Sequence, residues 1–133
     1  MTGIDTNVLV RYLVQDEPEQ AKKATRFITN ECSSEDPGFI NRIVLCELVW
    51  VLETAYGYAR EQVSQALEKI LRTAQFEIED HHESWSSLRE YQNGADFADS
   101  LIAAVNRGHG CERSVTFDRK AGRRTGFVSL SVA

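Results

Sequence analysis

The chain has 133 residues, 42% of them hydrophobic, which suits one compact domain with a single core. Twenty acidic and 15 basic residues give a net charge of −5, which argues against a protein with a broadly basic, nucleic-acid-binding surface. No apolar run approaches the roughly 20 residues that span a bilayer, and the N-terminus lacks the basic segment and apolar core of a secretory signal. We therefore expect one cytoplasmic domain over residues 1–133 that does not enter a membrane.

The first half of the chain alternates short strand patterns with helical ones. The expected elements are, in order, a strand over 1–5, helices over 8–14 and about 17–32, a brief strand at 39–40, and an apolar helix that ends at 57. Asp16 is predicted to cap the second helix, because Pro18 suits a first helical turn and Glu19 stands at capping-box spacing. Asn41 is predicted to cap the apolar helix.

The second half continues this alternation. Helices are expected over 60–74, 83–91 and 96–106, and strands over 76–79, 113–117 and 127–130. Short strands separated by helices indicate an α/β domain with a short, mostly parallel central sheet flanked by helices. The sequence contains no repeat, linker or low-complexity segment, so a single domain is the simplest interpretation.

Five carboxylates stand within or beside apolar segments: Asp5, Glu47, Asp96, Asp99 and Asp118. Glu47 is the only charged residue between Arg42 and Glu53. A carboxylate buried in apolar surroundings is costly unless something compensates its charge. When several acids share that environment, a bound cation is the simplest compensation. Without these five acids, the acidic and basic residues would be equal in number at 15 each, which is compatible with a neutral body that carries one acidic pocket.

The positions of the acids in the predicted elements favour one shared site. Asp5 ends the first strand and Asp118 follows the penultimate one, and functional groups gather at the carboxyl ends of parallel strands. Asp96 and Asp99 share one face at the start of a helix, where the helix dipole favours anions. Oxygen ligands without histidine or thiolate suit Mg²⁺ or Mn²⁺. Such an ion activates water for attack on a phosphate ester, so the sequence predicts metal-dependent hydrolysis.

Each acid alone also has a structural interpretation. The aspartates that precede helices could serve as caps, and Asp118 could begin a turn. A buried salt bridge to Arg11 or Arg42 is the corresponding explanation for Glu47. The combination of several such acids favours the metal site over a series of independent structural roles.

At these residues the sequence resembles the PIN-domain ribonucleases, and specifically the VapC-type toxins of bacterial toxin–antitoxin pairs. The resemblance covers nearly the whole chain and rests on four segments in matching order. They are GIDTNVLVR from Gly3, LCELVWVL from Leu45, DFADSLIAA from Asp96 and TFDRKA from Thr116. Each segment alone is a weak signal, but together they are specific.

The resemblance implies a PIN-like domain that cleaves RNA with Mg²⁺ or Mn²⁺. The catalytic and metal-binding residues that it implies are Asp5, Glu47, Asp99 and Asp118. The accessory residues that it implies are Asp96, as a further metal ligand, and Thr6, Asn7 and Thr116. It also implies an RNA substrate, a small antitoxin protein that covers the acidic cleft, and a homodimer. Many family members have Ser or Thr near the start of the glutamate-bearing helix, where this chain has Asn41 and Arg42.

A basic cluster follows the last acid directly. It consists of Arg119, Lys120, Arg123 and Arg124. These side chains are candidates for contact with RNA phosphates beside the metal. A solvated loop of ordinary basic residues is the other interpretation.

Two other functions are compatible with parts of the pattern. A phosphatase of the haloacid-dehalogenase kind would use Asp5 as the nucleophile at the end of the first strand. That chemistry needs a second acid two positions later, where this chain has Asn7. A non-catalytic module could instead use the acids to bind a basic peptide.

Overall fold

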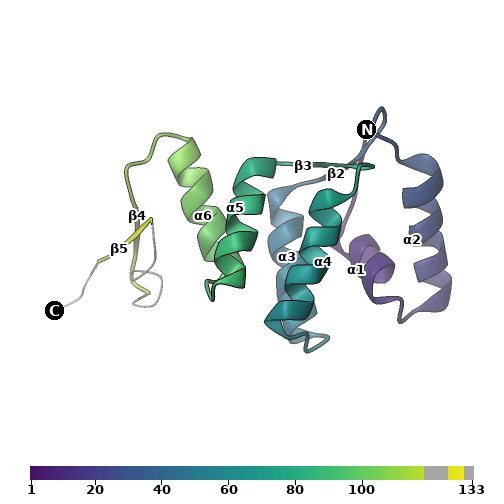
Figure 1. Cartoon of the computed structure of the whole chain (residues 1–133), viewed down its shortest axis with the longest axis horizontal. Coiled ribbons are helices and arrows are strands. Elements are labelled where there is room, and N and C mark those ends of the chain that lie inside the picture. Colours follow the sequence, from purple (N-terminus) through teal and green to yellow (C-terminus); the bar gives the residue numbers. More distant parts are fainter. Residues whose placement is uncertain (119–125, 131–133) are drawn as a thin grey trace. The chain divides into compact units, whose positions relative to one another are not determined.

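The computed structural model (Figure 1) describes residues 1–118 and 126–130. The chain forms two compact units, one of residues 1–81 and one of residues 82–133. The first unit holds a three-stranded sheet, and the described part of the second holds a pair of strands. Every described strand pair is parallel, which confirms the predicted α/β class with a mostly parallel sheet.

The sheet of the first unit has the strand order β1-β2-β3. Its strands are β1 (Thr2–Gly3), β2 (Gly38–Ile40) and β3 (Phe76–Ile78). Thr2 pairs with Gly38, and Gly38 pairs in turn with Phe76. Because the strands are parallel, the chain leaves all three at the same edge of the sheet. Asp5 and Asn41 follow β1 and β2 at this edge, which is where we expected functional groups to gather.

Four helices accompany this sheet. They are α1 (Thr6–Val14), α2 (Pro18–Glu31), α3 (Arg42–Thr54) and α4 (Arg60–Arg72). Helix α1 packs against both α2 and α3, and α3 packs against α4. The core between them contains fully buried leucines from three of these helices: Leu9, Leu45, Leu48, Leu52 and Leu67. The apolar periodicity that predicted these helices is thus the pattern of their buried faces.

The N-cap residue predicted from the sequence is correct for α3 but wrong for α2. Asn41 caps α3, and its Oδ1 accepts a hydrogen bond from the Val44 amide at 2.9 Å. The predicted cap of α2 is wrong, because the N-cap residue is Glu17 and its side chain makes no capping bond. The carboxylate of Asp16 is instead bound by Arg11 and Tyr56, contacts that no local sequence pattern indicates.

The second unit begins within α5 (His81–Gln92) and continues with α6 (Phe97–Gly108). Two short strands follow, β4 (Ser114–Thr116) and β5 (Phe127–Ser129). The predicted strands in this region are confirmed in shortened form. The rings of Tyr91 and Phe97, both buried, meet edge to face with centroids 6.4 Å apart and join the end of α5 to the start of α6.

In the part of the chain that the structure describes, no helix has the length and apolar character needed to cross a membrane.

The cap of α3 should contribute measurably to stability. We expect Asn41→Ala to lower the free energy of unfolding by about 1 kcal/mol, because the Val44 amide loses its acceptor. Urea denaturation followed by circular dichroism measures this change. Asn30→Ala, on the exposed surface of α2, is the matched control and should not destabilise the protein. Equal losses in the two variants would contradict the capping role.

Candidate active site

Asp5 and Glu47 line one cavity of about 280 Å³ in the first unit, which we call the acidic cavity. Asp5 precedes α1 and Glu47 lies in α3, two helices that pack against each other. The other residues of the lining are Thr6, Asn7, Val10, Arg11, Val51, Ala55 and Tyr56. The structure therefore brings together the predicted residues Asp5, Thr6, Asn7 and Glu47, although 40 positions separate Asn7 from Glu47 in the sequence.

Thr6 connects the two acids of this cavity. Its backbone amide donates a hydrogen bond of 2.8 Å to the Asp5 carboxylate, which caps α1. Its side-chain hydroxyl donates a hydrogen bond to Oε1 of Glu47. Thr6 itself is buried, so its rotamer is held by packing. One buried residue thus orients both carboxylates, which supports the accessory role predicted for Thr6.

Glu47 is exposed, so the expectation of a carboxylate buried in an apolar interior is wrong. Helix α3 buries one face, of which Leu45 and Leu48 are part, and exposes the opposite face. Glu47 shares the exposed face with the apolar residues Ile43 and Trp50. Both faces of α3 carry apolar residues, so the sequence shows an almost unbroken apolar segment. A helix nevertheless buries only one face against the core, and Glu47 lies on the other.

The salt-bridge explanation for Glu47 is also wrong within the described residues. Nη1 of Arg11 lies 3.3 Å from the Asp16 carboxylate. Nη1 of Arg42 lies 2.8 Å from the carboxylate of Asp80. Neither arginine forms an ion pair with Glu47 in the structure.

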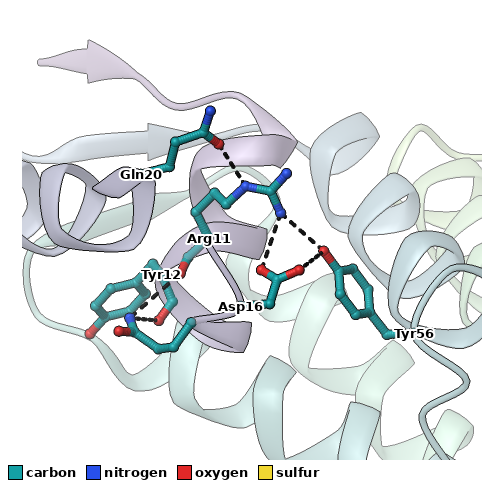
Figure 2. A network of polar contacts seen from close by, with 6 residues as sticks. Arg11, Tyr12, Asp16, Gln20 and Tyr56 are labelled. Carbon is teal, nitrogen blue, oxygen red and sulfur yellow. Dashed lines mark hydrogen bonds and ion pairs between the residues drawn. The ribbon is translucent and has the colours of Figure 1, made fainter. Parts of the chain in front are cut away.

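Arg11 is the centre of a polar network at the edge of the acidic cavity (Figure 2). Its Nε donates to Gln20 at 2.7 Å, and its Nη1 donates to the Tyr56 hydroxyl at 3.0 Å and to Asp16. The Tyr56 hydroxyl donates in turn to Asp16 at 2.9 Å. The hydrogen bond with Tyr56 is the main cause that raises the pKa of Arg11 above its usual value, and the negative charge of Asp16 adds to it.

Sequence reasoning did not single out Arg11 as a site residue, and Tyr56 was not placed near it. A signal for Arg11 existed, because it is the only charged residue between Asp5 and Asp16. No comparable signal existed for Tyr56, which lies just beyond the end of α3 and reaches Arg11 across 45 positions of sequence.

Arg11 also lines a second cavity in the first unit, of about 520 Å³. Asp5 and Asn7 line both cavities, so the two adjoin along the first turns of α1. Gln20, Lys23 and Phe27 of α2 also line this second cavity.

In the second unit, Asp96 and Asp99 lie together at the start of α6. Asp96 is the N-cap, and its Oδ1 accepts a hydrogen bond of 2.9 Å from the Asp99 amide. The capping interpretation is therefore correct for Asp96. Asp99 lies in the first turn, where a carboxylate interacts favourably with the helix dipole.

Asp118 follows β4, and its amide donates a hydrogen bond of 3.0 Å to the Thr116 hydroxyl. The chain turns back between α6 and β4, because the Asn106 amide group donates to Ser114 at 2.8 Å.

Each unit supplies part of the predicted metal-binding set. In neither unit do three or more described histidine, cysteine, aspartate or glutamate residues form a group that could hold an ion. The acidic cavity offers two carboxylates, the hydroxyls of Thr6 and Tyr56 and the Asn7 amide, with no histidine or cysteine in its lining. These hard oxygen donors fit Mg²⁺ or Mn²⁺ and not zinc. The basic residues Arg119, Lys120, Arg123 and Arg124 lie outside the described residues.

Comparison with known proteins shows the family to which the chain belongs. The sequence model of the PIN domain matches residues 4–127. The chain belongs to the PIN-domain family. This PIN domain is also 26% identical over 132 residues to a VapC ribonuclease of Aquifex aeolicus (strain VF5), a match that covers 98% of this chain and 96% of that protein. The family match contains all five acids and extends over both units, in agreement with the resemblance seen in the sequence.

The link through Thr6 should be detectable as an energetic coupling. We expect Thr6→Val to lower the free energy of unfolding by about 1 kcal/mol, because Glu47 loses its hydroxyl donor. The same substitution in a Glu47→Ala background should change stability much less, and urea denaturation of the four proteins measures the difference. If Thr6→Val has the same effect in both backgrounds, the hydrogen bond does not couple the two residues.

Proposed function

We propose that this PIN domain is a Mg²⁺- or Mn²⁺-dependent endoribonuclease and the toxin of a type II toxin–antitoxin pair. The observation that carries the proposal is the shared cavity of Asp5 and Glu47, with both carboxylates hydrogen-bonded to Thr6. Membership of the PIN-domain family and similarity to a VapC ribonuclease over nearly the whole chain support it.

In this proposal the catalytic and metal-holding residues are Asp5, Glu47, Asp99 and Asp118. These carboxylates would hold a divalent ion, which when bound would supply Lewis-acid chemistry for hydrolysis of a phosphodiester. Thr6 orients Asp5 and Glu47 while leaving carboxylate oxygens of both available for the ion. A carboxylate of this set accepts the proton that the attacking water releases.

The accessory residues have supporting roles in the same proposal. Asp96 holds the first turn of α6, which carries Asp99, and is a further candidate ligand. Thr116 holds the backbone at Asp118. Asn7, which lines the acidic cavity, orients Asp5 or a bound water through its amide. The basic residues Arg119, Lys120, Arg123 and Arg124 would contact RNA phosphates, which a nuclease needs for binding a polyanion.

The proposal includes two protein partners. One is a small antitoxin whose tail covers the acidic residues, and the other is a second copy of this chain in a homodimer. The similarity to a protein named VapC ribonuclease supports the antitoxin, and the homodimer rests on the family resemblance of the sequence. Co-expression with a short neighbouring reading frame should abolish the growth defect caused by the chain alone, and multi-angle light scattering measures the oligomeric state.

The haloacid-dehalogenase alternative is not retained. The matching family is the PIN domain, and Asn7 stands where that phosphatase chemistry needs a second acid.

Activity should depend on the metal and on both acids of the cavity. Purified protein is expected to cut single-stranded RNA with Mg²⁺ or Mn²⁺ and to stop when EDTA removes the ion. Asp5→Asn and Glu47→Gln should each lower kcat/KM on the order of 100-fold or more, because each removes a charged metal ligand. End-labelled RNA resolved on a sequencing gel measures the rates.

Glu31→Gln is the matched control, because it removes an equal charge from the exposed end of α2. Full cleavage by Asp5→Asn would contradict the assignment. Calorimetry with Mn²⁺ separates the nuclease from a non-catalytic peptide-binding module. Heat of binding that Glu47→Gln abolishes supports the ion site, whereas no detectable binding by the wild type supports the module.

A further inference from the structure

The acidic cavity contains one basic side chain. Among its lining residues Asp5 and Glu47 are negative, and Arg11 is the positive one. Arg11 lies six positions after Asp5, and α1 rises about 9 Å over that interval. The cavity therefore has an acidic end and a basic end along the same two helices.

The Arg11 guanidinium is held in place by partners from three parts of the first unit (Figure 2). Gln20 belongs to α2, Asp16 to the connection between α1 and α2, and Tyr56 to the segment after α3. These partners use Nε and Nη1. Nη2 forms no hydrogen bond with any residue that the structure describes, so two donor hydrogens remain for a ligand.

The ion pair with Asp16 does not account for this arrangement. It is a single contact of 3.3 Å between side chains that are 29% and 42% exposed, and pairs of this kind contribute little stability. The Asp16 carboxylate is shared with the Tyr56 hydroxyl, which orients it. Asp16 and Tyr56 thus together hold the Arg11 guanidinium in one orientation.

We propose that Arg11 binds an RNA phosphate next to the one that is cleaved, and that Gln20, Asp16 and Tyr56 position it for this contact. The inference rests on the proposed nuclease function. A phosphodiester placed at Asp5 and Glu47 has neighbouring phosphates along the same RNA strand. Arg11 is the positively charged residue of the cavity lining that can bind one of these phosphates. The planar, permanently charged guanidinium suits phosphate oxygens. Lys23, which lines the adjoining cavity with Arg11, continues the positive path.

Binding of a fluorescein-labelled single-stranded RNA to the full-length protein, measured by anisotropy in EDTA, tests this role without cleavage. We expect Arg11→Gln to raise Kd by about 5- to 10-fold near 0.1 M salt. It should also reduce the slope of log K against log salt by about 0.7, the value for one phosphate contact on a single strand. Arg26→Gln changes the net charge equally on the exposed side of α2 and should leave the slope unchanged.

Two further variants keep the test decisive if Arg11→Gln does not fold. Arg11→Lys retains the positive charge but loses the planar set of guanidinium donors. The slope of log K against log salt should therefore persist while Kd rises about 3-fold. Tyr56→Phe removes the hydroxyl that orients Arg11 and Asp16, so Kd should rise with an unchanged slope. Circular dichroism confirms that each variant is folded.

Equal Kd and slope in Arg11→Gln and the wild type would overturn the inference, as would a loss that Arg26→Gln reproduces. Where only the conservative variants fold, wild-type Kd in both Arg11→Lys and Tyr56→Phe would overturn it. A wild-type protein that neither binds nor cleaves RNA would instead contradict the proposed nuclease function, so the two failures are distinguishable.

Discussion

The arrangement of the acidic cavity in the first unit depends on the hydrogen bonds of Thr6. Its amide and hydroxyl bind Asp5 and Glu47, two carboxylates from elements far apart in the chain. Two like charges in one cavity repel each other, and in water each would adopt several rotamers. A buried residue that donates to both removes that freedom and leaves oxygens directed toward the cavity. The packing of α1 against α3 makes this possible. The same helix contact therefore builds the core of the first unit and places the two acids of the cavity.

Charge along the cavity is the second organising feature. Carboxylates alone attract a cation but repel a polyanionic substrate, and a nuclease has to bind both. The first unit places Arg11 in the same lining as Asp5 and Glu47 and supports it with Asp16 and Tyr56. The proposed phosphate contact at Arg11 would give a chain with a net charge of −5 a local positive site for its substrate. Overall net charge is therefore a poor guide to its substrate.

Helix α3 shows where inference from local sequence fails. Its run of apolar residues suggested that Glu47 is surrounded by the core, yet Glu47 is exposed together with Ile43 and Trp50. The conclusion that Glu47 is functional agrees with its place in the cavity, but the premise of a buried charge was wrong. The cap predicted at Asp16 failed for a related reason, because tertiary contacts from Arg11 and Tyr56 engaged the side chain that local spacing assigned to α2.

The sequence by itself determined the α/β class, the position of nearly every element and the family, because periodicity, capping residues and motif order are local properties of the chain. It also predicted Asp5, Thr6, Asn7 and Glu47 as site residues, since each lies in a motif segment, and the structure brings these four together. Only the tertiary structure decided that one threonine joins the two acids, that Glu47 faces outward and that Tyr56 meets Arg11. These facts depend on how α1 packs against α3, and no spacing along the chain encodes which side chains meet across two packed helices.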